Sequence, residues 1–182
     1  GTIQVQNSSG EITTSSSTLT IDYAVLNDVS GSNAYIRDLF DHNGAGGYTW
    51  QYANNFVATP NAVASFERAL QSWTCTTFVN WRVGNSTSVD VAAVDGTNIV
   101  RWNSGMPAGV LGWYLRYSDL CVSGTTTEAP APELDIEFST AFSWEFGPAS
   151  PSASEVDFES VAVHELGHAH QLGHIIASGR VM

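Results

Sequence analysis

Four of the five histidines in this chain lie in one short stretch near its end, from His164 to His174. The stretch begins with the pattern H-E-x-x-H, in which Glu165 follows His164 and precedes His168. Because an α-helix turns about 100° per residue, the two histidines would lie about 40° apart on one helical face. Two imidazoles in that arrangement can bind one metal ion, and the adjacent carboxylate can act on water there. The stretch therefore predicts a helix that carries a metal site.

A third ligand must come from outside this pair, because hydrolytic zinc sites commonly take three protein ligands. If the helix continued, His174 would lie about 80° off the face of His164 and ~15 Å farther along the axis. His174 can therefore bind the same ion only if the helix ends soon after His168, and Gly173 is one residue that could end it. His170 falls about 120° from His164, which favours a structural or solvated side chain.

The spacing of His164, Glu165, His168 and His174 resembles the H-E-x-x-H-x-x-G-x-x-H signature of the metzincin zinc metallopeptidases. The matrixin branch is the most similar, because Met182 follows His174 by eight residues, as in the methionine turn of matrixins. The overall character of the sequence resembles bacterial secreted members more than animal ones. The resemblance implies that the three histidines bind one catalytic zinc ion. It also implies that Met182 forms a hydrophobic floor beneath them.

Two upstream segments extend the resemblance. The segment 134–138 is similar to the strand that neighbours the family's substrate-binding edge strand. The edge strand itself is matched by Gly109, Val110, Leu111 and Gly112. The strand over 111–117 could therefore receive an extended peptide as an added antiparallel strand. Calcium stabilises many folds of this family, and Asp135 and Glu137, which we expect to face outward, are candidate calcium ligands.

The chain departs from the family signature at Gln171, where the family has glycine. That glycine lies where the chain turns out of the helix, and a non-glycine residue with positive φ costs about 1–2 kcal/mol, which metal binding could offset. Alternatively, Gln171 keeps a negative φ and the turn is rebuilt. The departure, together with the end of the chain at Met182, supports an alternative function: a metzincin-fold binding or surface module with weak or no catalysis.

The main function implied by the resemblance is a secreted zinc-dependent metalloendopeptidase that hydrolyses extended protein substrates. Glu165 would be the general base, which takes a proton from zinc-activated water and passes it to the leaving amine. One zinc ion is expected, and structural calcium is a further candidate. The expected partner is a protein or peptide substrate, and the chain is expected to be a monomer.

Sequence patterns before the metal motif predict a mixed fold. Alternating apolar residues or short apolar runs indicate strands over 19–25, 48–52, 79–83, 89–94, 98–102, 111–117 and 134–138. Thr59 and Pro60 open a helix as N-cap and first helical residue, and Ser154 or Asp157 could cap the last helix. Loops are expected over 125–132 and 147–154.

We therefore expect an α+β, zincin-like fold, in which a twisted mixed sheet of about five strands packs on two long helices, the second carrying the zinc motif. With 182 residues, the chain is expected to form one catalytic domain, 1–182. The Ser/Thr-rich segment 1–18 is expected to be a loose N-terminal segment, of which one part is a candidate edge strand. The C-terminal subdomain is expected to be short or truncated at the methionine turn.

The composition indicates which partners are not expected and whether the two cysteines form a disulfide. The net charge is −12, all six positive residues are arginine, and lysine is absent, so a basic face for nucleic acid is not expected. No apolar run approaches the ~18 residues of a membrane span. Cys75 and Cys121 are the only cysteines, and an even count in a sequence with secreted character favours a disulfide between them, with two buried thiols as the alternative.

Overall fold

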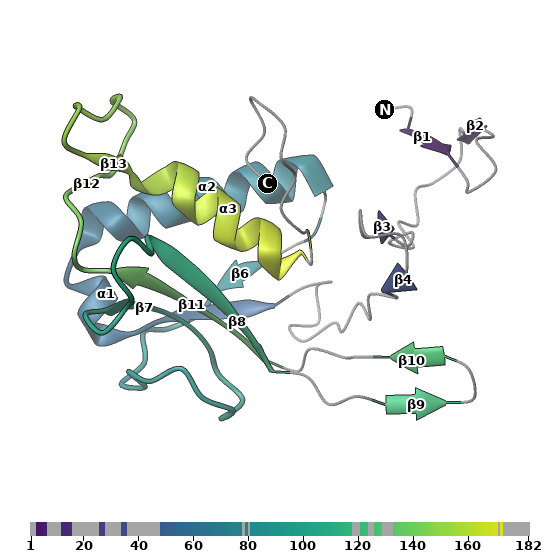
Figure 1. The fold of residues 1–182 in the computed structure, drawn as a ribbon, viewed down its shortest axis with the longest axis horizontal. Helices are drawn as coiled ribbons and strands as arrows, with labels where there is room; N and C mark the ends of the chain where they lie inside the picture. The colour runs from purple at the N-terminus through teal and green to yellow at the C-terminus, as the bar shows by residue number, and fades with distance from the viewer. Residues whose placement is uncertain are drawn as a thin grey trace.

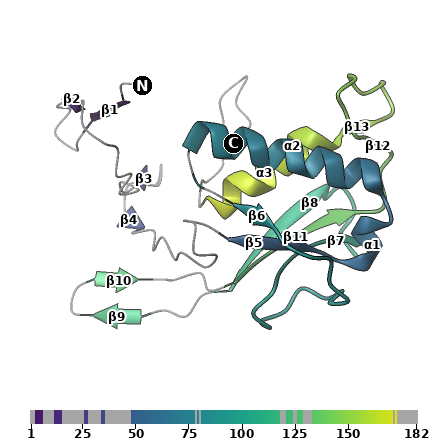
Figure 2. The ribbon, with the colours of Figure 1, turned by 180° about the vertical axis from the view of Figure 1, so that it is seen from behind.

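The chain has a mixed α+β architecture in which two helices cover one face of a five-stranded mixed sheet (Figure 1). The computed structural model describes residues 3–6, 12–15, 26–27, 34–35, 48–77, 79, 81–117, 121–123, 126–128, 133–170 and 172. In Figure 2, the reverse view, α2 (Pro60–Thr77) and α3 (Phe158–Ala169) again lie together above the sheet. The fold class predicted from the sequence is therefore confirmed at the level of α+β with a mixed sheet.

The sheet has the strand order β6-β5-β7-β11-β8. Its strands are β5 (Thr49–Tyr52), β6 (Arg82–Val83), β7 (Asn98–Asn103), β8 (Gly112–Tyr117) and β11 (Glu133–Ser139). Neighbouring strands run parallel except for β8, which runs antiparallel to β11. Within the described part of the chain, β8 therefore forms one edge of the sheet.

Shorter elements complete the fold. They are helix α1 (Asn54–Val57) and the strands β1 (Ile3–Gln6), β2 (Ile12–Ser15), β3 (Leu26–Asn27), β4 (Ala34–Tyr35), β9 (Cys121–Ser123), β10 (Thr126–Glu128), β12 (Trp144–Glu145) and β13 (Val156–Asp157). β1 pairs with β2, β3 with β4 and β9 with β10, all antiparallel, whereas β12 and β13 pair in parallel. β1 and β2 fall in the segment expected to be loose, and β10 falls in the loop expected over 125–132.

An aromatic core joins the helices to the sheet. Phe138 of β11 packs against Phe158 at the start of α3, with ring centroids 4.5 Å apart. Phe56 of α1 contacts both rings, and Phe66 of α2 and Trp50 of β5 extend the cluster across the sheet. All five side chains are fully buried. Burial of aromatic rings of this size dominates the energetics of a small core.

Most predicted elements of the central fold are present. The strands expected at 48–52, 98–102, 111–117 and 134–138 correspond to β5, β7, β8 and β11. α2 has 18 residues but α3 only 12, so the prediction of two long helices is not confirmed for α3. Asp157 caps α3 by accepting a hydrogen bond from the Ser160 N–H. The strand expected at 19–25 lies outside the described residues.

The strand expected over 89–94 is wrong, because this segment belongs to a loop, 84–97, between β6 and β7. Its amides bind carboxylates on β11 instead of a neighbouring strand. The N–H of Ala93 donates to Asp135, and the N–H groups of Asp95 and Gly96 donate to Glu133. A short apolar run therefore forms no strand here, since the N–H groups of Val89 and Ala93 within it and of the two residues after it bind side chains.

The expectation that Asp135 and Glu137 face solvent is wrong. Both point away from the helices, on the sheet face opposite to Leu134, Ile136 and Phe138, but they do not face solvent. Asp135 is fully buried and Glu137 is 2% exposed. The alternation along β11 is as predicted. Asp135 is covered by the loop, through the Ala93 N–H, whereas the Glu137 carboxylate is held by Arg101, Asn103 and Trp113 of the neighbouring strands. In the part of the chain that the structure describes, no helix is both long and apolar enough to span a membrane.

Candidate metal centre

His164 and His168 meet on one face of α3. Their Nε2 atoms lie 3.1 Å apart, and the rings are nearly perpendicular, at 83°. Two nitrogens that bind one tetrahedral zinc ion at about 2.0–2.1 Å are separated by about 3.3 Å, so the observed pair needs only a small adjustment to share an ion. The helical spacing predicted from the sequence therefore brings these two nitrogens to a common point.

The other nitrogen of His168 is oriented by the backbone after the helix. His168 Nδ1 lies 2.9 Å from the carbonyl oxygen of Leu172. Because a carbonyl oxygen only accepts hydrogen bonds, Nδ1 carries the proton, and the lone pair of His168 is left on Nε2. A backbone carbonyl that fixes the tautomer in this way is typical of histidines that bind metals.

This contact depends on where α3 ends. The helix ends at Ala169, and the N–H of Leu172 bonds back to the carbonyl of Gly167 at 3.0 Å. A bond of this span closes a helix in the manner of a Schellman motif. The helix thus stops between His168 and His174, which is the condition that a third histidine ligand requires. His174, Gln171 and Met182 themselves lie outside the described residues.

Glu165 lies beside the two histidines and is 5% exposed. Burial raises the pKa of its carboxyl group to about 7. The edge strand passes directly against it, since a β-carbon added to Gly112 would lie 3.3 Å from Glu165 Cγ. A carboxylate in so dry a position is well placed to exchange protons near neutral pH.

The edge strand β8 also reaches the histidines. The ring of Tyr114 lies nearly parallel to that of His168, with centroids 6.3 Å apart. Of the segment expected to begin the edge strand, only Gly112 belongs to β8. Gly109 has φ of +85°, and the N–H of Val110 bonds to the Pro107 carbonyl, so a turn precedes the strand. The Leu111 carbonyl already accepts from Ser139 of β11, at 2.9 Å.

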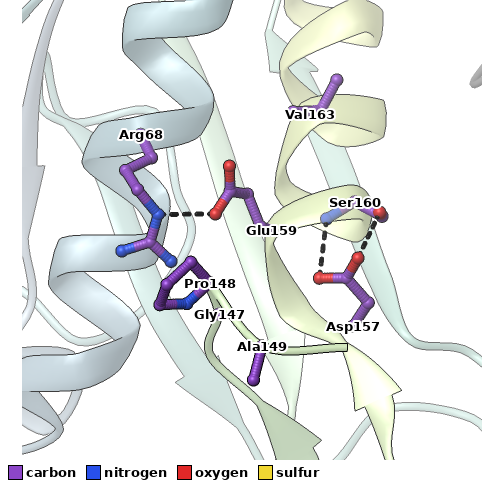
Figure 3. A pocket seen from close by; sticks show the side chains of 8 residues that line it. All are labelled: Arg68, Gly147, Pro148, Ala149, Asp157, Glu159, Ser160 and Val163. Carbon is purple, nitrogen blue, oxygen red and sulfur yellow. Dashed lines mark hydrogen bonds and ion pairs between the residues drawn. The ribbon is translucent and has the colours of Figure 1, made fainter. Parts of the chain in front are cut away.

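A second set of contacts fixes the start of α3 (Figure 3). A pocket of about 350 Å³ opens there between α2, α3 and the segment 147–149. Its lining residues are Arg68, Gly147, Pro148, Ala149, Asp157, Glu159, Ser160 and Val163. Arg68 Nε lies 2.6 Å from Glu159 Oε2, and the guanidinium also donates to the Phe146 carbonyl. Arg68 and Glu159 thus bind one another and tie the metal-motif helix to α2, whereas the Asp157 carboxylate binds Ser160.

His170 is a core residue. Of the two interpretations made from the sequence, a structural or a solvated side chain, the structural one is confirmed. It is 3% exposed and stacks against Trp81, with ring centroids 4.0 Å apart. Trp73 contacts the same ring at 4.6 Å. The apolar periodicity of α2 placed Trp73 on the core side, but nothing in the sequence indicated that its partner would be a histidine.

The predicted disulfide between Cys75 and Cys121 is not tested by the structure and stays a prediction. Cys75 is exposed near the end of α2, where it is a free thiol within the described residues and accepts a hydrogen bond from the Gln71 amide. Cys121 begins β9, and its side chain lies outside what the structure describes.

The calcium prediction is likewise untested. The two candidate carboxylates bind donors of the protein itself: Asp135 accepts from the Ile99 N–H, and Glu137 accepts from Arg101. Within the described ranges, no three His, Cys, Asp or Glu side chains form a group that could hold a metal ion. His174 is not part of those ranges.

Comparison with known proteins does not assign the chain to a family. No family model matches the chain, and no curated protein matches it either. Because a fold alone does not specify an activity, the evidence for function lies in the chemistry of the site.

Proposed function

We propose that the chain is a secreted, monomeric zinc-dependent metalloendopeptidase of the matrixin-like metzincin type, with a zincin-like fold. The observation that carries the proposal is the convergence of His164 and His168, whose Nε2 atoms lie 3.1 Å apart, beside the buried carboxylate of Glu165. The carbonyl of Leu172 supports it, because it leaves the lone pair of His168 on the nitrogen that faces His164.

In this proposal His164, His168 and His174 bind one zinc ion, and Met182 lies beneath them. When bound, zinc supplies Lewis-acid activation of water and of the peptide carbonyl. Glu165 takes a proton from the attacking water and returns it to the leaving amine. Its low exposure keeps bulk water from competing for that proton, which favours transfer between protein and substrate.

Strand β8 holds the substrate in this proposal. It lies at the sheet edge, and its Gly112 and Tyr114 are adjacent to Glu165 and His168. An extended peptide added antiparallel to β8 would pass over the histidines and place a backbone carbonyl near them. Recognition through main-chain hydrogen bonds demands little of the substrate's sequence and suits a protease of broad specificity.

The test is zinc analysis combined with a casein assay. We expect one zinc per chain, hydrolysis of casein by the natural sequence, and loss of hydrolysis with zinc retained in Glu165→Ala. The partly exposed Glu155, directly before β13, gives a matched control: Glu155→Ala should keep both properties.

The outcomes separate the metalloendopeptidase from the binding module. Stoichiometric zinc with unchanged cleavage by Glu165→Ala would remove the general-base role of Glu165. Zinc bound without any turnover of casein or gelatin by the natural sequence would favour the binding module. Absence of zinc after dialysis against a slight excess of the ion would contradict both the metalloendopeptidase and the binding module.

A further inference from the structure

The register of β8 decides which of its backbone groups face outward. Ser139 N–H bonds to the Leu111 carbonyl at 2.9 Å, and the same register pairs Trp113 with Glu137. In an antiparallel ladder, hydrogen-bonded and non-hydrogen-bonded pairs alternate. Trp113 therefore directs its backbone N–H and C=O toward β11, whereas the flanking Gly112 directs its own toward the open side of the sheet.

Side chains alternate in the same way. Gly112 lies on the helix side, next to Phe138 and Glu165, so the Trp113 side chain lies on the opposite face of the sheet. There its indole Nε1–H donates to a carboxylate oxygen of Glu137, the residue directly across the ladder. The edge strand is thus joined to β11 by a side-chain bond as well as by the backbone.

Glu137 is held in turn by the neighbouring strand. The oxygen that accepts from Trp113 also accepts from Asn103 Nδ2 at 2.8 Å, and the other oxygen accepts from Arg101 Nη1 at 2.5 Å. Arg101 also binds Asp90 of the loop 84–97, with Nε 3.0 Å from Oδ1. Glu137 is only 2% exposed, so these charge-assisted bonds lie in a medium where they are stronger and more directional than in water.

We propose that Glu137 is a positioning residue for peptide binding: through Trp113 it fixes the twist and position of β8, the strand that receives the extended chain. This inference rests on the proposed use of β8 in the proposed function. A strand with one neighbour can twist and shift more freely than a central strand, and an added strand needs several outward groups aligned at once. Glu137 holds β8 from the face opposite to Glu165 and does not touch the substrate.

Trp113→Phe is the sharpest test, because it removes the indole donor and keeps an aromatic ring. Trp144→Phe is the matched control, since it removes another indole donor, which binds the Ser139 carbonyl and does not lie on β8. Both are made in a Glu165→Ala chain, which cannot cleave the probe. The probe is fluorescein-labelled casein, an unfolded chain, and its anisotropy gives the dissociation constant.

We expect Trp113→Phe to weaken casein binding by about threefold to tenfold, the range that corresponds to loss of one partly buried hydrogen bond. Amide hydrogen exchange of residues 112–117 should accelerate by a similar factor. Trp144→Phe should change neither quantity. Glu137→Gln should weaken binding in the same direction, because it removes the charge that holds Arg101, and if that chain does not fold, Trp113→Phe decides alone.

The active chain provides a second measurement. In the presence of Glu165, Trp113→Phe should raise KM for casein threefold to tenfold and lower kcat by less than twofold. Equal casein affinity of Trp113→Phe and Trp144→Phe would overturn the inference. So would failure of the Glu165→Ala chain to bind casein at all. Failure of the active chain to cleave casein that it does bind would contradict the proposed function and leave the binding test of Glu137 decisive.

Discussion

Gly112 of β8 and Glu165 of α3 are so close that a β-carbon on the glycine would lie 3.3 Å from Glu165 Cγ. The same β-carbon would lie 3.2 Å from Phe138 Cδ1 and 3.3 Å from the carbonyl oxygen of Glu137. Two of these neighbours belong to the sheet and cannot move far. Glycine therefore sets the separation between the edge strand and the proposed general base.

Gly112→Ala should lower kcat/KM for casein by about tenfold, because displacing β8 or Glu165 by a few tenths of an ångström misaligns substrate and base. Gly84→Ala is the control, since its β-carbon would lie 3.0 Å from Thr49 Cγ2, next to β6 at the other edge of the sheet. We expect Gly84→Ala to lose some thermal stability and keep its activity per folded molecule. Equal kcat/KM values for the two variants would contradict this account of Gly112.

Removal of the metal should lower thermal stability. A ligand present at about 100 times its dissociation constant adds about 2.7 kcal/mol, which for a chain of this size corresponds to about 5–10 °C in the melting temperature. EDTA should therefore lower the melting temperature of the natural sequence by that amount and leave His168→Ala unaffected. A shift of the same size in His168→Ala would place the metal elsewhere.

His170, the residue that follows α3, should behave differently from His164 and His168 on that helix. Its buried ring contacts both Trp73 and Trp81, so His170→Ala opens a cavity in the core and should cost about 2–3 kcal/mol of unfolding free energy. His170→Phe keeps a flat ring and should cost less. Both variants should bind one zinc per chain, as measured by metal analysis of the folded protein. Loss of zinc from the well-folded His170→Phe would make His170 part of the metal centre.

Asp135 gives a pH dependence of stability. Burial raises the pKa of Asp135 to about 7, although N–H groups of Ile99 and Ala93 oppose the shift by binding the charged form. The folded state then binds this proton more tightly than the unfolded state. The contribution of Asp135 is therefore fully present below the unfolded pKa, near 4, and is lost as the pH rises through about 7.

Urea unfolding of the natural sequence and of Asp135→Asn at pH 4, 5.5, 7 and 8 measures this contribution. Asp135→Asn loses a hydrogen-bond acceptor and should be less stable at pH 4. The difference between the two proteins should shrink as the pH rises, by about 1–2 kcal/mol after allowance for screening. The titration of the histidines does not affect this difference, because both proteins contain the same histidines. A difference that stays constant across this range would mean that the pKa of Asp135 is the same in the folded and unfolded states.

Local patterns predicted the elements that lie next to the site. Alternation of apolar residues identified β7, β8 and β11, because each has one face on the core, and the i, i+4 spacing placed His164 and His168 together. Asp157 was one of two candidate caps for α3, because a cap depends on residues within about four positions in the sequence. In each case the interactions that decide the structure are close in the sequence.

Contacts between distant residues were not predictable in this way. The apolar run 89–94 has the pattern of a strand, and only the distant carboxylates of Glu133 and Asp135 explain why it forms a loop. The same holds for the Leu172 carbonyl that orients His168, since it depends on the path of the chain after the helix. Nothing in the alternation along β8 indicated that Trp113 would bind Glu137.

The way in which loop 84–97 is held bears on how its sequence can change. Glu133 and Asp135 bind the loop through the backbone N–H groups of Ala93, Asp95 and Gly96. Because the side chains at the first two positions take no part in these bonds, many substitutions there should leave the loop attached. Proline is the exception, since it has no N–H to donate. Substitutions at positions 93 and 95 can therefore accumulate while the attachment of the loop to β11 is kept.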